Sequence, residues 1–299
     1  MAGIPLLGPA PSRGVDGADV DRAAAGALEA DRRFVISLGG YALEIAGATL
    51  VTHEKVPVPR FNFVEAYGVG AERQTAFFER ALDHYFQRAL RPTFRVPEPV
   101  PGHLDAGLRR FGFAPRSSPL VLLLSTGERP DPLGPTVDVR PAIAGELDQV
   151  AAFWASERER PELRSALDVV LSHPNPHERL AALLARIGEE PVASALVYRH
   201  RDVAGIHAVA TRPEARGQGA ASAIVRYALE RDPVGPGARY SIFADSPRLE
   251  RRLGRLGFRP ALSFRQYDLP AGAELAIPPV GPRTPPRWRP PRGGTGPRG

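Results

Sequence analysis

Apolar residues in the second half of the chain follow two patterns, one typical of helices and one typical of strands. Spacings of three and four residues predict helices at 144–156, 163–171, 221–230 and 249–256. Apolar runs bounded by turns predict strands at 180–187, 192–198, 204–211, 240–244 and 262–269. The first three strands are separated by only a few residues, which favours antiparallel hairpins. With a first strand before the helices, the predicted order is strand, two helices, three strands, and two helix–strand pairs.

Two segments half a chain apart are similar to each other. LDAGLRRFGFAP, residues 104–115, aligns with LERRLGRLGFRP, residues 249–260, at a constant offset of 145, and six of the twelve positions are identical. Each copy has the pattern of an amphipathic helix that ends at a glycine and is followed by a strand, which in the first half is 120–124. The offset is about half the chain length, so the repeat predicts an internal duplication.

Composition divides the chain into five segments. The stretch GERPDPLGPT, residues 127–136, is rich in proline and glycine and separates two apolar regions. The two ends of the chain have too few apolar residues to build a core. We therefore expect a flexible N-terminus (1–18), a first domain (19–126), a linker (127–136), a second domain (137–270) and a disordered tail rich in proline and arginine (271–299).

The junction after the predicted strand 204–211 has the sequence RGQGAA, residues 216–221. Glycines let the backbone curl around an anion, and the N–H groups and positive dipole end of the following helix favour a pyrophosphate. Arg216 can add positive charge. A Gly-x-Gly sequence can also be a simple connector. Its position between a strand and an amphipathic helix, with the repeat helix downstream, favours ligand binding.

The second half resembles the GCN5-related N-acetyltransferase (GNAT) superfamily, whose signature R/Q-x-x-G-x-G/A follows the fourth strand. The resemblance covers about residues 137–269. It implies that acetyl-CoA or another acyl-CoA is the cosubstrate, with its pyrophosphate on the loop and its pantetheine arm along a splayed fourth strand. It also implies an oxyanion hole made by backbone donors near the thioester. The cofactor-binding residues implied in this way are Val209, Ala210, Thr211, Arg216, Gly217, Gln218, Gly219, Ala220 and Ala221.

The first half lacks this loop. The offset of 145 leads from RGQGAA to AERQTA, residues 71–76, where the arginine and both glycines are missing and Glu72 faces the phosphate position. A preceding strand at 61–65 and a helix with apolar residues from Phe78 to Tyr85 persist. We expect a degenerate GNAT copy, with an unrelated N-terminal α+β domain as the alternative. The expected fold class is α+β with a mixed sheet: two tandem GNAT-like domains, each a mostly antiparallel twisted sheet flanked by helices.

His207 is the candidate catalytic base. Alternation along the strand places it on one face with Val209 and Thr211, which would be near the thioester if the cosubstrate binds as the resemblance implies. Family members with a histidine at this position use it, with water, to remove the amine proton. A histidine that is packed or hydrogen-bonded for structural reasons is the alternative.

The candidate general acid is less clear. The family's usual tyrosine, five residues before the phenylalanine of the Gly-Phe pair, is replaced here by Leu253. Ser246, aligned with a frequent asparagine of the family, is a weak catalytic substitute. Tyr240 and Tyr267 are phenols that could approach from elsewhere. A thiolate can also leave unprotonated and take its proton from solvent.

Composition and charge exclude several other classes. The chain contains no cysteine, so thiolate metal sites, disulfides and cysteine nucleophiles are excluded, and we expect no metal. The longest aliphatic run, 120–124, is far shorter than the ~20 residues of a membrane-spanning helix, and no signal peptide is evident; we expect a cytoplasmic protein without a membrane partner. Five of the six excess positive charges are arginines in 281–299, so the charge distribution argues against a nucleic-acid partner.

The sequence therefore predicts an acyl-CoA-dependent N-acetyltransferase that transfers an acetyl or other acyl group to an amine. The acceptor is expected to be a small-molecule amine or a protein amino group. The alternative is a non-catalytic acyl-CoA sensor or partner-binding module, which is suggested by Leu253 and by the silent first half. Nucleic-acid binding by the tail is a third hypothesis. The sequence predicts neither the acceptor's identity nor the oligomeric state.

Overall fold

The computed structural model of the chain describes residues 17–127, 137–154 and 178–270. We refer to residues 17–127 as the first half and to residues 137–270 as the second half. The first half contributes the helices α1 (Gly17–Ser37), α2 (Gln74–Phe86) and α3 (Gly102–Arg110). Its strands are β1 (Tyr41–Ile45), β2 (Ala48–Thr52), β3 (Phe63–Ala66), β4 (Thr93–Pro97), β5 (Ala114–Pro115) and β6 (Leu120–Ser125).

The second half follows the predicted order of elements. Its helices are α4 (Leu147–Trp154), α6 (Ala220–Arg231) and α7 (Pro247–Arg255). Its strands are β7 (Asp138–Pro141), β8 (Glu178–Ile187), β9 (Glu190–His200), β10 (Val203–Thr211), β11 (Arg239–Ala244) and β12 (Phe258–Asp268). The predicted hairpins β8–β9 and β9–β10 are antiparallel, as expected. The helix predicted at 163–171 lies outside the described residues.

The repeated segments form equivalent structures in the two halves. Each begins as a short helix, α3 or α7, and each helix is followed by a glycine with φ of 85°, Gly112 or Gly257. A glycine can adopt this left-handed conformation without steric strain, so it ends the helix and redirects the chain into a strand. The helix end predicted from the repeat is therefore confirmed at both positions.

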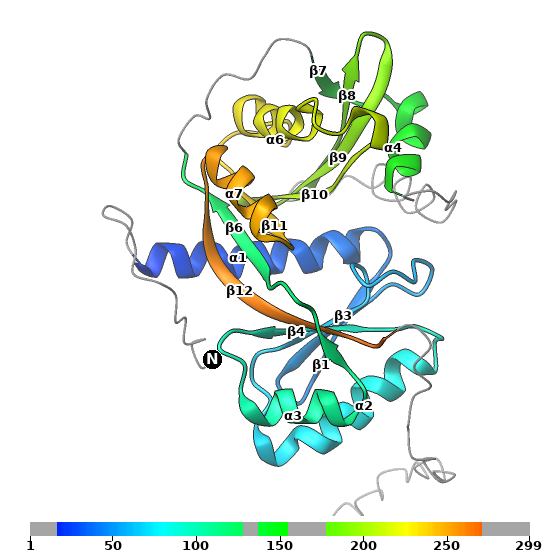
Figure 1. Ribbon diagram of the computed structural model, residues 1–299, viewed down its shortest axis with the longest axis vertical. Coiled ribbons are helices and arrows are strands. Elements are labelled where there is room, and N and C mark those ends of the chain that lie inside the picture. Colours follow the sequence, from blue (N-terminus) through cyan, green and yellow to red (C-terminus); the bar gives the residue numbers. More distant parts are fainter. Residues whose placement is uncertain (1–16, 128–136, 155–177, 271–299) are drawn as a thin grey trace, which may run out of the picture.

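The strands in the described part of the chain all join in one sheet of twelve (Figure 1). The order is β1-β2-β3-β4-β12-β6-β11-β10-β9-β8-β7, with β5 beside β12. Most neighbouring strands are antiparallel, while β3–β4 and β10–β11 are parallel. The expected α+β class, a mixed and mostly antiparallel sheet flanked by helices, is thus confirmed.

The two halves exchange their last strands. β6 belongs to the first half but pairs with β11 of the second half, and β12 belongs to the second half but pairs with β4 of the first. β6 and β12 also pair with each other at the centre of the sheet. The hydrogen bonds that close each half's sheet are therefore supplied by the other half. The limits 19–126 and 137–270 stay a prediction about the duplicated units.

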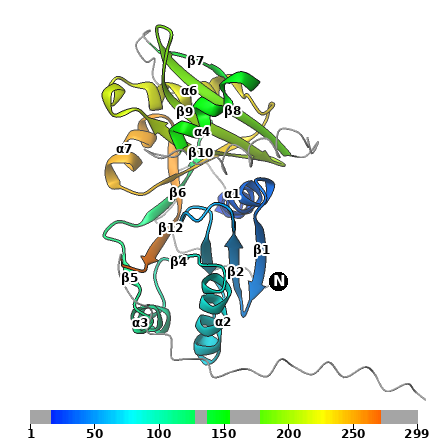
Figure 2. The same cartoon turned by 90° about the vertical axis from the view of Figure 1, so that its right-hand side faces the viewer.

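Helix α1 of the first half lies where the two halves meet, and it packs against strands of both (Figure 2). Phe34 and Val35 join a core that contains residues of β2, α4, β8 and β9, and Leu28 joins a core with β6, β10 and β12. The face of the sheet that points away from α1 is covered by α2 and α3 in the first half and by α6 and α7 in the second. None of the described helices is long and apolar enough to cross a membrane.

Candidate functional site

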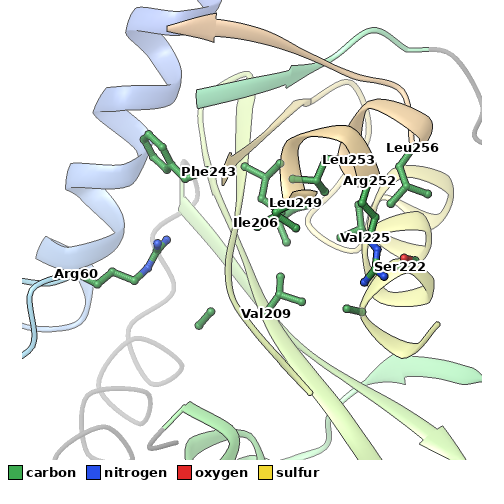
Figure 3. A pocket seen from close by; sticks show the side chains of 13 residues that line it. Arg60, Ile206, Val209, Ser222, Val225, Phe243, Leu249, Arg252, Leu253 and Leu256 are labelled. Carbon is green, nitrogen blue, oxygen red and sulfur yellow. The ribbon is translucent and has the colours of Figure 1, made fainter. Parts of the chain in front are cut away.

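The parallel strands β10 and β11 separate after a short paired stretch. Residues 203–205 pair with 239–241, and the two strands diverge beyond that point. A cavity of about 260 Å³ lies where they separate, next to α6 and α7 (Figure 3). The lining residues are mainly apolar: Arg60, Ile206, Ala208, Val209, Ala221, Ser222, Val225, Ile242, Phe243, Leu249, Arg252, Leu253 and Leu256. The unpaired edge of β10 can hydrogen bond to an extended ligand placed there.

A β-bulge shapes the cavity side of β10. The pairing with β9 shifts its register between His207 and Ala210, and Ala208 has φ of 51°. This left-handed conformation is uncommon for residues other than glycine. The extra residue turns Val209 to the same side as Ile206, and both line the cavity. Bulges often re-aim groups beside active sites, and this bulge does so at the mouth of the separated strands.

The loop between β10 and α6 ends in two glycines with positive φ, 85° at Gly217 and 88° at Gly219. Gly219 precedes the first turn of α6, and no side chain caps that turn. The first N–H groups of a helix have no partner within the helix, so they are free to bind an anion. A Cβ added at either glycine would meet no atom within 4 Å, which shows that the loop surface is open.

Two backbone donors of the predicted pyrophosphate site are already used. The N–H of Arg216 donates to the carbonyl oxygen of Pro213 at 3.2 Å, and the N–H of Gln218 donates to that of Ala215 at 3.4 Å. A short 3₁₀ helix at Pro213–Ala215 produces this arrangement. The backbone donors that remain for a pyrophosphate are therefore the N–H groups of Gly217 and of the residues from Gly219 onward. The exposed side chain of Arg216 can still contribute positive charge.

The predicted cofactor residues occupy two parts of one continuous surface. Val209 and Ala221 line the cavity. Ala210 and Thr211 continue the pairing of β10 with β9, so the edge of β10 that faces away from β9 is left for a ligand. The first turn of α6, which carries the lining residues Ala221 and Ser222, connects this edge to the glycine loop (Figure 3).

His207 is buried behind the cavity wall rather than facing it. Its ring stacks on Phe34 of α1, with centroids 4.0 Å apart, and it is not among the lining residues. The bulge interrupts the alternation of side chains, so Val209 turns into the core beneath α6 while His207 points to α1. The expectation that His207 shares a face with Val209 and Thr211 is therefore wrong.

The basic nitrogen of His207 is also occupied. Nη2 of Arg60 lies 2.9 Å from Nδ1 of His207 and donates to it, because a guanidinium has no acceptor. Burial, together with the positive charge of Arg60, lowers the pKa of His207 to about 3. The imidazole is thus neutral near pH 7, with its proton on Nε2. His207 is therefore better suited to position the Arg60 side chain than to accept a proton from the substrate.

The other predicted catalytic groups lie away from the cavity. Ser246 caps α7, with its Oγ accepting from the N–H of Leu249 at 3.4 Å. The hydroxyl of Tyr267 donates to Asp105 at 2.7 Å, and burial together with this contact raises the pKa of Tyr267 to about 12. The hydroxyl of Tyr240 donates to Asp232. Among the described residues, no tyrosine lines the cavity.

Sequence reasoning missed one residue that a helical pattern could have revealed. Four residues of α7 and its C-cap, at the spacing i, i+3, i+4 and i+7, line the cavity: Leu249, Arg252, Leu253 and Leu256. The pattern of Arg251, Arg252 and Arg255 predicts a basic surface on this helix rather than part of a binding groove, but Arg252 lines the cavity. The signal that could have revealed Arg252 is its place on the apolar stripe of an amphipathic helix, because a charged side chain there lies at the edge of a groove.

Arg60 was missed for a different reason. It lies between β2 and β3 of the first half, yet it lines the cavity of the second half and contacts His207, 147 residues further along the chain. No local pattern marks a contact of this range. The two charged residues that line the cavity are thus both arginines, which favours a ligand with negative charge.

Among the described residues, no cluster of three or more His, Asp or Glu side chains could hold a metal ion.

Comparison with known proteins agrees with this geometry. Residues 133–234 match the family model of an acetyltransferase (GNAT) domain. A GCN5-related N-acetyltransferase from Kribbella flavida has 19% identity and a TM-score of 0.59, over 87% of this chain and 98% of that chain. One from Sphaerobacter thermophilus has 18% identity and a TM-score of 0.57, over 88% and 96%. A functionally unknown conserved protein from Staphylococcus epidermidis has 13% identity and a TM-score of 0.57, over 78% and 95%.

A search of curated proteins finds no match to the sequence. At the identities of the solved structures, the likeness shows the fold, and the family model covers the cavity-bearing strands β8 to β10 and helix α6. The separated strands, the bulge and the uncapped helix with its glycine loop all lie in or beside that matched region. The resemblance noted in the sequence is therefore confirmed: the chain contains a domain of the GCN5-related N-acetyltransferase superfamily and has the fold of these proteins.

Proposed function

We propose that the chain is an acyl-CoA-dependent N-acyltransferase whose cosubstrate binds between β10 and β11. One observation carries this proposal: a strand-edge cavity is lined by the first turn of a helix, and an open glycine loop directly precedes that turn. The loop suits a pyrophosphate, and the cavity suits a narrow arm that carries a thioester. Acetyl-CoA has both parts in this order. Two statements stay predictions: that the protein is cytoplasmic, and that the first half has lost cosubstrate binding.

Each end of the cosubstrate would have its own partners. The N–H groups of Gly217, Gly219 and the first turn of α6 would bind the pyrophosphate, with Arg216 and Arg252 supplying charge. The pantetheine amides would hydrogen bond to the free edge of β10 beside Val209. Apolar residues of α7 and β11 would exclude water from the thioester, which strengthens any polar interaction made there.

The transfer itself needs few protein groups. The neutral amine nitrogen of the acceptor attacks the thioester carbonyl carbon, the C–N bond forms, and the C–S bond breaks to release CoA as a thiolate. The proton lost by the nitrogen passes to water. Backbone N–H groups near the bulge of β10 would stabilise the oxyanion. No role as base is assigned to His207, because its Nδ1 accepts a hydrogen bond from Arg60.

Isothermal titration with acetyl-CoA tests the binding step. Wild-type protein should bind one equivalent, and Gly219→Glu should weaken binding by at least about 100-fold, because a carboxylate would repel the pyrophosphate. Gly219→Ala is the matched control, since it has the same positive-φ strain without the charge and should retain most of the affinity. Thr75→Glu, which places the same charge at the start of α2, should leave binding unchanged. Absence of binding to any acyl-CoA would refute the proposal.

The alternative is a protein that binds acyl-CoA without transferring the acyl group. Its support is Leu253, which stands in the cavity wall at the position of the family's usual acid and has 2% of its surface exposed. Release of free CoA thiol with a panel of amines distinguishes the two functions. Release well above the rate of slow hydrolysis supports the enzyme, and binding without such release supports the sensor.

A further inference from the structure

Arg60 stands at one end of the cavity and Arg252 at the other (Figure 3). Arg252 lies on α7 beside Ser222 at the start of α6, the end proposed for the pyrophosphate. Arg60 comes from the side of α1 and lies near Phe243. The middle of the cavity is apolar. The cavity thus offers a second cation at the end opposite the pyrophosphate site, and the phosphate groups of CoA do not account for it.

The guanidinium of Arg60 is incompletely neutralised. Its closest carboxylate oxygen, Oδ1 of Asp31, is 3.7 Å away, beyond hydrogen-bond distance. Asp31 makes its short contact, 2.8 Å, with Arg95 instead. The Nε of Arg60 is buried and has no hydrogen-bond partner, and Nη2 donates to the neutral His207. A cation in this state gains free energy from a ligand that supplies an anionic acceptor.

The surrounding cluster of charges has a positive excess. Three arginines, Arg32, Arg60 and Arg95, share the two buried carboxylates Asp31 and Glu65. Burial raises the pKa of Glu65, so any change in its protonation adds to this excess. Two further carboxylates lie at the margin: Glu29 pairs with Arg32 and also with Arg33, and the exposed Asp245 acts on Arg60 only at longer range. Of the three arginines, Arg60 is the one that lines the cavity.

We infer that Arg60 binds a carboxylate of the substrate at the α1 end of the cavity. This inference rests on the proposed function. The carboxylate belongs either to the amine acceptor, as in an amino acid, or to the acyl group of the donor, as in a dicarboxylic acyl-CoA. His207 and Asp31 act as positioning residues, because they hold the guanidinium toward the cavity. The planar guanidinium matches the two oxygens of a carboxylate.

The first arm of the test compares acceptors. Each of a panel of amino acids is assayed with acetyl-CoA beside its own amide, which keeps the amine and side chain but lacks the negative charge. If the acceptor carries the carboxylate, kcat/KM is at least about tenfold higher for the acid than for the amide. Arg60→Gln then raises KM for the acid at least about tenfold and by a clearly smaller factor for the amide, and Arg60→Lys restores part of the difference.

The second arm compares donors. Succinyl-CoA and butyryl-CoA have acyl chains of four carbons and differ in the terminal carboxylate. If the donor carries the carboxylate, titration shows at least about tenfold tighter binding of succinyl-CoA, and Arg60→Gln removes the difference. Arg32→Gln is the matched control for both arms: it removes one charge from the same cluster, does not line the cavity, and should keep the preference.

The outcomes separate this inference from the proposed function. A chain that binds CoA but prefers neither acids nor succinyl-CoA, or keeps its preference in Arg60→Gln, overturns the inference and leaves the acyltransferase standing. A chain that binds no acyl-CoA overturns the proposed function itself. Thermal unfolding of each variant shows that a lost preference is measured on folded protein.

Discussion

The two halves of the chain build the same pair of parallel strands and helices, but they differ in the side chains that lie between these elements. In the first half β3 and β4 pair in parallel and α2 and α3 cover them, as β10, β11, α6 and α7 do in the second. The 145-residue offset relates Ser222 and Ala223 to Phe77 and Phe78. Small residues leave the cavity open in the second half, and two buried phenylalanines fill the equivalent space in the first.

The helices differ in the same way. Arg252 at the cavity edge corresponds to Gly107 on α3. A Cβ at Gly107 would lie 1.9 Å from Nε2 of Gln74 and 2.4 Å from the ring of Phe78, so this glycine lets α3 approach α2 closely. In addition, Gln74 donates to the carbonyl oxygen of His103, which ties the two helices together. The same fold can thus hold a ligand or a closed core, depending on a few side-chain volumes. This closure supports the prediction of a degenerate first copy.

The largest expected effect comes from reopening the closed half. Phe78→Ala removes a ring that packs against Phe77, Phe94 and Phe111, and should lower the free energy of unfolding by about 3–5 kcal/mol. Urea denaturation measures this change, and Ile143→Ala, at an exposed apolar residue, should change stability by less than about 0.5 kcal/mol. A change below about 1 kcal/mol in Phe78→Ala would contradict the closed core.

The reciprocal change closes the open half. Ser222→Phe places in the cavity the residue type that occupies the equivalent position in the first half. Because the ring would take the space proposed for the cosubstrate, acetyl-CoA should bind at least about 100-fold more weakly, equivalent to about 2.7 kcal/mol. Isothermal titration gives the affinity and urea denaturation confirms the fold. Unchanged affinity would place the ligand elsewhere.

One substitution at two helix glycines should have opposite effects. Gly107→Ala introduces the clash with Gln74 and Phe78 and should destabilise the protein by about 1–3 kcal/mol. Gly254→Ala on α7 meets nothing within 4 Å and should stabilise it by about 0.5–1 kcal/mol through helix propensity. Denaturation curves of the two variants give the comparison. Equal effects would show that α2 and α3 are no closer than α6 and α7.

The last prediction concerns the buried ring of His207, which joins β10 of the second half to α1 of the first. His207 has its ordinary pKa, 6.5, in the unfolded chain and one of about 3 in the folded protein. Below pH 6.5 the unfolded state therefore binds more protons, and stability falls as the pH falls toward 3. At pH 5.5 this amounts to about 1.4 kcal/mol relative to pH 7.5.

His207→Gln should remove that part of the pH dependence. Asp31, which also faces this ring, has a lowered pKa and stays charged at pH 5.5, and Glu65 acts in the opposite direction because burial raises its pKa. These groups are unchanged in the variant, so the difference between the two proteins isolates the histidine. Parallel urea titrations at pH 7.5 and 5.5 measure it. The same pH dependence in both proteins would show that His207 is not buried as a neutral ring.

Local patterns predicted the elements of the second half well. The strands β8 to β11 and helix α6 have strong periodicity, and the positive φ of Gly217 and Gly219 follows from a loop that must turn sharply into a helix. The face of His207 was mispredicted because a bulge adds one residue and reverses the alternation after it. Nothing in the residues VAGIHAVAT marks the bulge, since Ala208 adopts a conformation that alanine seldom favours.

The sequence by itself determined the elements of each repeat and the glycine loop before α6, because these depend on residues within a few positions of one another. Only the tertiary structure decided which strands close which sheet, since β6 and β12 have no local feature that selects a partner in the opposite half. The same is true of Arg60, which reaches the second half's cavity only because α1 and the exchanged strands bring the halves together. Contacts across the chain depend on packing and burial, and for that reason the charge at the α1 end of the cavity emerged from the fold alone.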